Sequence, residues 1–216
     1  MEILRTANAG VLLKLDGVTI LLDGVCREVR PYLATPLHRR EALRENWPDA
    51  VAFTHMHKDH YDPDYAAEFS KCTGGVILGP NQLSGGRATQ ESMRVGDITV
   101  TPVKSRHIGA AGKDTQHYSF LIQGSQCVFF TGDASPSQWR DMKLPKIDVL
   151  IAPYAYAITP AGWQAAKALG AERIVLVHMP SRETDPDSLW DMVLGVTGGA
   201  DGATFYTPAM EEYIEI

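Results

Sequence analysis

Residues 54–62 read Thr-His-Met-His-Lys-Asp-His-Tyr-Asp and place three histidines and two aspartates within nine positions. The preceding residues 49–53, Asp-Ala-Val-Ala-Phe, are apolar after the first and are typical of a strand. Side chains two positions apart on an extended chain point to one face, so His55 and His57 project together. This dense group of metal-ligand residue types predicts a metal-binding cassette.

The end of the cassette predicts a change in chain direction. Asp62 is a typical helix N-cap, and Pro63 suits the first position of a helix. The turn into this helix aims Asp59 and His60 away from the first two histidines. Four ligand-type side chains with two directions favour two neighbouring metal ions over a single crowded one.

Three further candidate ligands follow apolar runs elsewhere in the chain. A polar residue at the end of a buried strand lies where the sites of layered α/β folds form. The three are His107 shortly after residues 98–103, Asp133 after residues 128–132 and His178 after residues 173–177.

The order of these motifs over residues 1–178 resembles the metallo-β-lactamase superfamily in its dinuclear hydrolase form. The resemblance rests on His55-x-His57-x-Asp59-His60, then His107, then Thr131-Gly132-Asp133, then His178. It implies a first metal ion held by His55, His57 and His107, a second held by Asp59, His60 and His178, and a bridging Asp133. Residues 147–178 are also similar to the branch that contains the ascorbate-phosphate lactonase.

The composition fits one domain over residues 1–216, which the resemblance implies is a metallo-hydrolase domain. The chain is 44% hydrophobic, and it has no run of eighteen or more apolar residues. The first residues lack the pattern of a secretory signal, so we expect a cytoplasmic protein without a membrane segment. Three scattered cysteines, Cys26, Cys72 and Cys127, predict free thiols.

The arrangement of predicted elements favours an α+β fold. Two hairpins are predicted, one over residues 12–22 and one over residues 118–130, and each ends close to an acid. Strands that lead to ligands and helices that lead away imply a four-layer αβ/βα sandwich, in which two facing mixed sheets have helices outside. Five pairs of a cap residue and proline predict helix starts: Thr35-Pro36, Asp62-Pro63, Ser135-Pro136, Thr159-Pro160 and Asp185-Pro186. Residues 82–90 and 108–116 are predicted to be loops, and residues 26–47 are long enough to cover the site.

Four other residues are candidates for supporting the ligands or contacting substrate. Asp23 ends the first hairpin and is a candidate support for a ligand. His117 precedes a predicted strand and has either a structural role or a role as proton donor. Tyr154 and Tyr156 alternate onto one side of a predicted extended loop, so they either line the pocket or pack in the core. By contrast, we expect Lys58 and Arg106 either behind the ligands or on the surface rather than in contact with substrate, and His38 on the surface.

The predicted reaction is hydrolysis of a small ester, lactone or phosphoester by a hydroxide held between two divalent metal ions. Such ions lower the pKa of bound water from about 15.7 towards about 7. Asp59 is then the predicted catalytic residue, because it orients the water and passes on its proton. The histidine-rich ligand set favours zinc, and the aspartates also suit manganese or iron.

Other functions share the same residues. The formal net charge of -6 argues against a nuclease that holds a nucleic acid, although a phosphodiesterase would use the same ions. A di-iron oxidoreductase of this fold resembles the chain less, because that branch has glutamate where this chain has His57. A metal-binding sensor module with little turnover is the remaining alternative, and metal-dependent turnover would decide it. The partner we expect is a small molecule, and a homo-oligomer stays open.

Overall fold

The computed structural model describes residues 1–81, 87–109, 112, 114–185, 187–199 and 202–216. Its α-helices are α1 (Leu37–Glu45), α2 (Pro63–Thr73), α3 (Ala155–Ile158), α4 (Pro160–Ala168) and α5 (Leu189–Thr197), with 3-10 helices at Pro136–Asp141 and Arg182–Thr184.

The first sheet is mixed and has seven strands. In spatial order they are β14 (Tyr213–Glu215), β1 (Glu2–Arg5), β2 (Val11–Leu15), β3 (Val18–Leu22), β4 (Ala50–Ala52), β5 (Val76–Leu78) and β6 (Arg87–Thr89). The pairs from β14 to β3 are antiparallel, and those from β3 to β6 are parallel. The predicted first hairpin is confirmed as β2–β3.

The second sheet also has seven strands and repeats this mixture. In spatial order they are β13 (Thr204–Tyr206), β12 (Arg173–Val177), β11 (Val149–Pro153), β10 (Cys127–Phe130), β9 (His117–Gln123), β8 (Ile98–Ser105) and β7 (Met93–Val95). The pairs from β13 to β10 are parallel, and those from β10 to β7 are antiparallel. The predicted second hairpin is confirmed as β9–β10.

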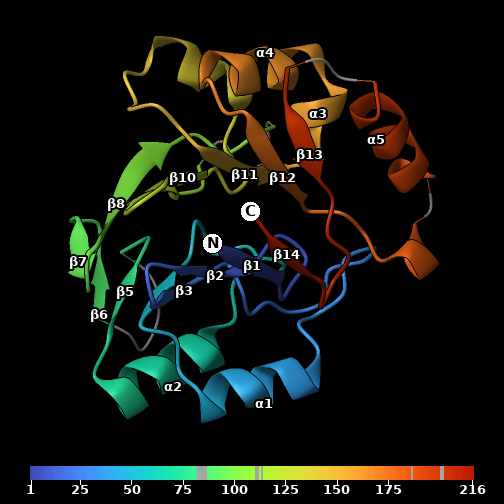
Figure 1. The fold of residues 1–216 in the computed structure, drawn as a ribbon. Coiled ribbons are helices and arrows are strands. Elements are labelled where there is room, and N and C mark those ends of the chain that lie inside the picture. Colours follow the sequence, from blue (N-terminus) through green and yellow to red (C-terminus); the bar gives the residue numbers. More distant parts are fainter. Residues whose placement is uncertain (82–86, 110–111, 113, 186, 200–201) are drawn as a thin grey trace.

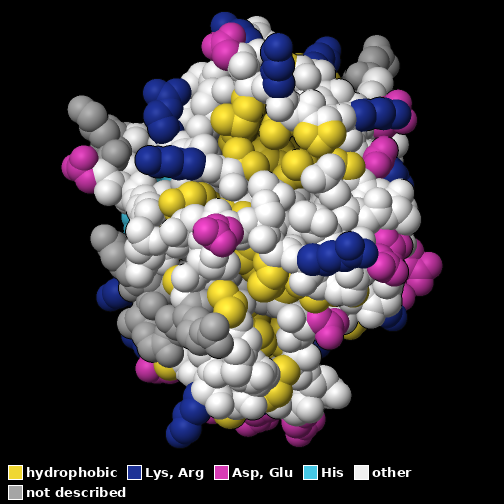
Figure 2. Space-filling view, turned by 90° about the vertical axis from the view of Figure 1, so that its left-hand side faces the viewer, with side chains coloured by type: hydrophobic (Ala, Val, Ile, Leu, Met, Phe, Trp, Pro, Cys, Tyr) yellow, Lys and Arg dark blue, Asp and Glu magenta, His cyan; other side chains and the backbone are white. Residues whose placement is uncertain are grey.

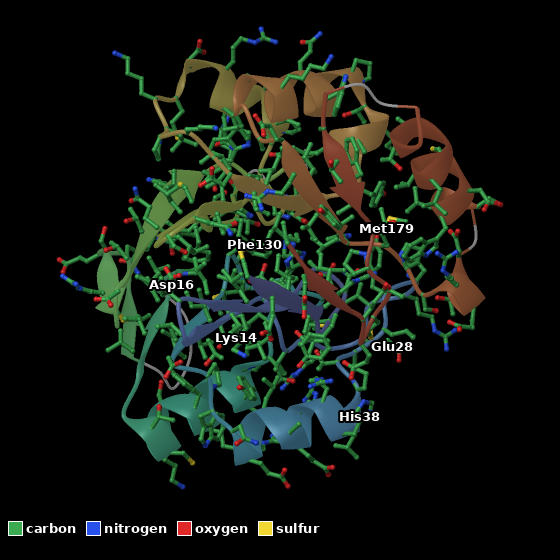
Figure 3. The ribbon with its side chains drawn as sticks, in the orientation of Figure 1. Lys14, Asp16, Glu28, His38, Phe130 and Met179 are labelled. Carbon is green, nitrogen blue, oxygen red and sulfur yellow. The ribbon has the colours of Figure 1, made fainter. Side chains whose placement is uncertain are left out.

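The two sheets face each other, with α1 and α2 outside the first sheet and α3, α4 and α5 outside the second (Figure 1). This is the predicted four-layer αβ/βα sandwich. Alternate strand residues such as Leu13, Ile20 and Phe130 fill the space between the sheets, where Figure 3 labels Phe130. Full burial of one such side chain stabilises the fold by about 1.5–3 kcal/mol.

Helix α2 shows how the sequence turns the chain just past the cassette. The carboxylate of Asp62 accepts hydrogen bonds from the backbone N–H groups of Asp64 and Tyr65, and Pro63 follows as the first helical residue. Gly74 ends the helix in the left-handed conformation, at φ 70°. The predicted N-cap Asp62 and the predicted proline at the first helical position are both confirmed, and they fix where the cassette ends.

Other local predictions need correction. The Thr35 hydroxyl contacts the Cys26 amide and the Gly24 carbonyl instead of capping α1, whose N-cap is Pro36. The segment after Ser135 is a 3-10 helix, not an α-helix. Thr159 caps α4 as predicted.

The segments predicted as loops also differ in part. Residues 87–89 form the edge strand β6, whereas residues 82–86 lie outside the described residues. Asp185 does hold a helix start, because its carboxylate accepts from the backbone N–H groups of Leu189 and Trp190. The predicted Pro186 at that start lies outside the described residues.

The surface carries charged side chains of both signs. Figure 2 shows lysine and arginine side chains scattered among acidic ones on one face. Within the described ranges, none of the helices has the length and apolar character needed to cross a membrane. Cys26, Cys72 and Cys127 are free, as predicted.

Candidate metal centre

His55, His57 and His107 form the first ligand group, and one ring nitrogen of each lies within 4.8 Å of the others. His55 and His57 follow β4, whereas His107 follows β8 of the opposite sheet. The ring centroids are 4.4 Å apart for His55 and His57 and 4.7 Å apart for His55 and His107. The fold therefore brings His107 to His55 and His57, although His107 follows them by about fifty residues in the sequence.

Asp59, His60 and His178 form the second ligand group, again within 4.8 Å. Asp59 and His60 come from the turn before α2, and His178 directly follows β12. His178 Nε2 lies 3.4 Å from Asp59 Oδ2, and His60 Nε2 lies 3.8 Å from the same oxygen. The turn in the cassette does divide its ligand-type residues between two groups.

Asp133 lies between the two groups. Its Oδ2 atom is 3.3 Å from His60 Nε2 and 3.3 Å from His178 Nε2, both in the second group. The same oxygen is 3.7 Å from His107 Nε2 in the first group. One carboxylate oxygen thus faces nitrogens of both groups, which is the position required of a bridging ligand.

Asp23, at the end of β3, supports both groups from behind. It is fully buried, and its Oδ2 accepts a hydrogen bond from His60 Nδ1 at 2.8 Å. The same oxygen accepts from the Thr54 hydroxyl at 2.6 Å, and that hydroxyl accepts from His55 Nδ1 at 2.9 Å. A carboxylate behind a ligand histidine fixes its tautomer and makes it a better ligand. Asp23 is therefore placed where the sequence predicted a supporting residue.

Two backbone features hold Asp133 and His178 in place. Gly132 has φ 52°, and a Cβ atom there would lie 2.5 Å from the Thr54 side chain, so only glycine fits before Asp133. His178 itself has φ 63°, which is uncommon for a residue with a side chain. Its backbone N–H donates to the Asn8 carbonyl at 3.0 Å, which anchors this conformation.

The donor atoms fit a transition-metal site. The Nε2 atoms of His55 and His107 are buried and have no hydrogen-bond partner among the described residues. Those of His60 and His178 face only carboxylate oxygens of Asp59 and Asp133, at 3.3 Å or more. An unpaired buried polar atom costs about 1–3 kcal/mol, so such atoms normally have a partner. Imidazole and carboxylate are ligands for zinc, iron and manganese. The residues present therefore fit divalent metal ions.

The electrostatics of the two groups differ. Burial lowers the pKa of His55 and of His57, which keeps these two imidazoles neutral. Burial acts the same way on His60, but the carboxylates of Asp133 and Asp23 outweigh it and raise the pKa of His60 well above its usual value. The pKa of His178 is raised to about 9, because Asp133 and Asp59 outweigh burial. Without metal, the second group therefore holds protons that a metal ion would have to displace.

The tyrosines near the site only partly match the prediction. Tyr154 and Tyr156 do not alternate along an extended loop, because Tyr156 lies within α3. Tyr156 is in the core, where its hydroxyl donates to the Ala134 carbonyl and accepts from Trp139 Nε1, so of its two expected roles core packing holds. Tyr154 does lie near the second group, with its ring 6.5 Å from that of His178.

Tyr32 is a residue at the site that sequence reasoning missed. Its ring packs edge-on against His178 with centroids 4.5 Å apart. Burial and the neighbouring Tyr154, Asp133 and Asp59 raise the pKa of the Tyr32 phenol, so it stays protonated. The length of segment 26–47 was the one available signal, and this segment does reach the site.

Arg5 is a second missed residue. It is fully buried, and its guanidinium donates to the carbonyls of Ala7, Asn8, Met179 and Pro208. Asn8 is the residue that anchors the His178 backbone, and Met179 follows His178, at the end of β12 in Figure 3. Arg5 therefore holds the strained turn that presents His178, although nothing in its sequence neighbourhood signals this.

The surface candidates lie where they were predicted. Lys58 and Arg106 are exposed, and His38 lies on α1 (Figure 3), paired with Glu211 at 3.0 Å. Arg106 nevertheless lines a cavity of about 480 Å³ beside His107, together with Lys104 and Thr115. Thr115 also lines a cavity of about 230 Å³ beside His57.

A two-sheet sandwich with histidines and aspartates gathered at one end defines a metal-dependent hydrolase of the metallo-β-lactamase type. The particular family follows from the sequence, because residues 4–178 match the profile of the beta-lactamase superfamily domain. The chain belongs to this family.

Known relatives agree with this assignment. A UPF0173 metal-dependent hydrolase of Methanopyrus kandleri is 26% identical over 215 residues, covering 87% of this chain and 89% of the relative. The fold is similar to that of a possible metal-dependent hydrolase from Veillonella parvula, with a TM-score of 0.73, 17% identity and coverage of 100% and 99%. It is also similar to that of an isothiocyanate hydrolase from Delia radicum gut bacteria, with a TM-score of 0.71, 18% identity and coverage of 100% and 99%.

Proposed function

We propose that this metal-dependent hydrolase binds two divalent metal ions and cleaves a small ester, lactone or phosphoester. His55, His57 and His107 would hold one ion, and Asp59, His60 and His178 the other, with Asp133 shared between them. The observation that carries the proposal is the single Asp133 oxygen that lies 3.3 Å from His60 Nε2 and 3.7 Å from His107 Nε2. A carboxylate placed between two sets of histidine nitrogens suits two ions better than one.

When bound, the ions would lower the pKa of a water molecule and polarise the carbonyl or phosphoryl oxygen of the substrate. The protein supplies the rest. Asp59 is partly accessible, with 14% of its side chain exposed, and it orients the attacking water and accepts its proton. In the metal-free protein, neighbouring His178 and His60 lower the pKa of Asp59 against the effect of burial.

The size and charge of the cavity support a small substrate. The cavity of about 480 Å³ beside His107 falls in the range of about 300–1,000 Å³ typical of small-molecule sites. Lys104 and Arg106 line it and suit an anionic group on the substrate. A nucleic acid would require a continuous basic surface, which the net charge of -6 does not favour.

The test is a hydrolysis screen. Chelator-stripped protein is reloaded separately with zinc, manganese or iron and assayed against small esters, lactones and phosphodiesters, with identically purified Asp59→Asn protein as the control. We expect metal-dependent turnover of a small substrate that Asp59→Asn lacks. No turnover with any metal would favour the sensor alternative.

The salt dependence of substrate affinity separates the nuclease alternative from a hydrolase of small substrates. A nuclease that contacts several phosphates loses on the order of a thousandfold or more in affinity between roughly 50 and 200 mM salt. A small anion held at a buried metal centre is screened much less. Cleavage of long RNA or DNA with that steep salt dependence, in preference to every small ester, would contradict the proposal.

A further inference from the structure

His117 is a buried histidine with an unpartnered Nε2 atom, like His55 and His107, yet it belongs to neither ligand group. It is the first residue of β9 and is 1% exposed. Its ring centroid lies 5.0 Å from that of His55 and 5.7 Å from that of His107. His117 thus lies directly beside the first ligand group.

The hydrogen bonds of His117 define which nitrogen carries the proton. The Ser119 hydroxyl donates to the Thr131 carbonyl at 2.7 Å, which uses its only hydrogen. The bond of 3.1 Å between the hydroxyls of Ser105 and Ser119 must therefore use the hydrogen of Ser105. The remaining bond, 2.7 Å between Ser105 Oγ and His117 Nδ1, must then use a hydrogen on Nδ1.

With its hydrogen on Nδ1, the ring of His117 has a free lone pair on Nε2. The same pattern holds for two of the candidate ligands, because a neutral imidazole carries one N–H and one acceptor nitrogen. His107 Nδ1 donates to the Ile108 carbonyl, and His55 Nδ1 donates to Thr54. In all three histidines Nε2 is buried without a hydrogen-bond partner among the described residues.

We propose that His117 is a fourth histidine ligand of the first metal ion, bound through Nε2 and oriented by Ser105, Ser119 and Thr131. Ligation uses an existing lone pair, so no proton has to leave His117. A hydrogen-bonded Nδ1 that orients the ring is the usual arrangement behind a ligand histidine. The inference rests on the metal binding of the proposed function, and it assigns His117 neither of the roles expected from the sequence.

Nuclear magnetic resonance of the loaded wild-type protein tests this without a substitution. The protein is labelled with nitrogen-15 histidine and loaded with an NMR-active cadmium isotope, so that each ligated nitrogen shows a coupling to the metal. Of the seven histidines, we expect six to show coupling, all except His38. Coupling at His55 and His107 without coupling at His117 overturns this inference alone, whereas no coupling at any histidine also overturns the proposed metal centre.

Variants give a second readout in metal affinity. Ser105→Ala breaks the chain that orients His117, and we expect the first ion to bind about tenfold more weakly, as typical for loss of a supporting contact. His117→Phe should weaken it further. Ser92→Ala is the matched control, because Ser92 is in an exposed hydroxyl pair with Thr101. Wild-type affinity in Ser105→Ala and His117→Phe would contradict the proposal.

Discussion

The two ligand groups differ in how the protein supports them. The first is made of imidazoles, and two of its members, His57 and His107, line cavities. The second contains a carboxylate and depends on distant contacts: Asp23 behind His60, and Tyr32 and Asn8 around His178. We infer that the first group faces the substrate, whereas the second is the more dependent on contacts behind its ligands. Substitutions should therefore affect the two groups unequally.

The largest expected effect is that of Asp59→Asn. The amide keeps the size of the side chain but removes the charge that orients water and contacts His178 at 3.4 Å. Activity should fall by roughly 10² to 10⁴-fold, the range for loss of a general acid–base group. Affinity for the first ion should stay near wild type, measured by metal titration. An equal loss at both groups would show that Asp59 is needed for the fold of the whole centre.

A smaller effect is expected for Asp23→Asn. This change removes the carboxylate that accepts from both His60 Nδ1 and the Thr54 hydroxyl. Affinity for the second ion should fall by about 10–100-fold, as for other residues that orient a ligand histidine. The first group, which Asp23 reaches only through Thr54, should lose less.

Thr54→Val is the matched control for Asp23→Asn. It breaks the contact with His55 Nδ1 and leaves the bond between His60 and Asp23 intact. Competition titrations with a chromophoric chelator would measure both ions. The account is contradicted if Asp23→Asn weakens the first ion more than the second.

The smallest expected effect is on the stability of the metal-free protein against pH. The pKa of His178 is raised to about 9 and that of His60 well above its usual value, so both are protonated in the folded apo-protein at neutral pH. A histidine whose pKa is higher in the folded than in the unfolded state contributes its full stabilisation below the unfolded pKa of about 6.5. This stabilisation is lost as the pH rises towards the folded pKa. Thermal or denaturant unfolding should show that the stability declines from about pH 6.5 to about pH 9.

The loaded protein is the control for this pH effect, because ligand histidines are neutral. Its stability should not decline over the same interval. A metal-free protein that gains stability between pH 6.5 and 9 would contradict the assigned charges of the second group.

The sequence predicted those parts of the centre that are local. The cassette could be predicted from the sequence, because strand periodicity puts His55 and His57 on one face, and because Asp62 and Pro63 mark the turn. The two hairpins could also be predicted, because each depends on a local two-residue turn that joins neighbouring strands. The grouping of the distant ligands came from the family resemblance, not from local pattern.

The parts that were missed depend on tertiary contacts. Tyr156 was placed on an extended loop, but the chain enters α3 and its hydroxyl finds Trp139 in the core. Tyr32 contacts His178, which is distant in sequence, and Ser105 contacts His117 only because β8 and β9 pair. No periodicity within one segment encodes such contacts.

The number of metal ions per chain tests the central claim most directly. Elemental analysis of loaded, buffer-exchanged protein should give two ions per chain, and a structure of the same sample should place one ion in each group with Asp133 in contact with both. Asp59→Asn should keep only the ion at His55, His57 and His107. A reproducible stoichiometry of one in the wild-type protein, with His60 or Asp133 not bound to metal, would contradict the account.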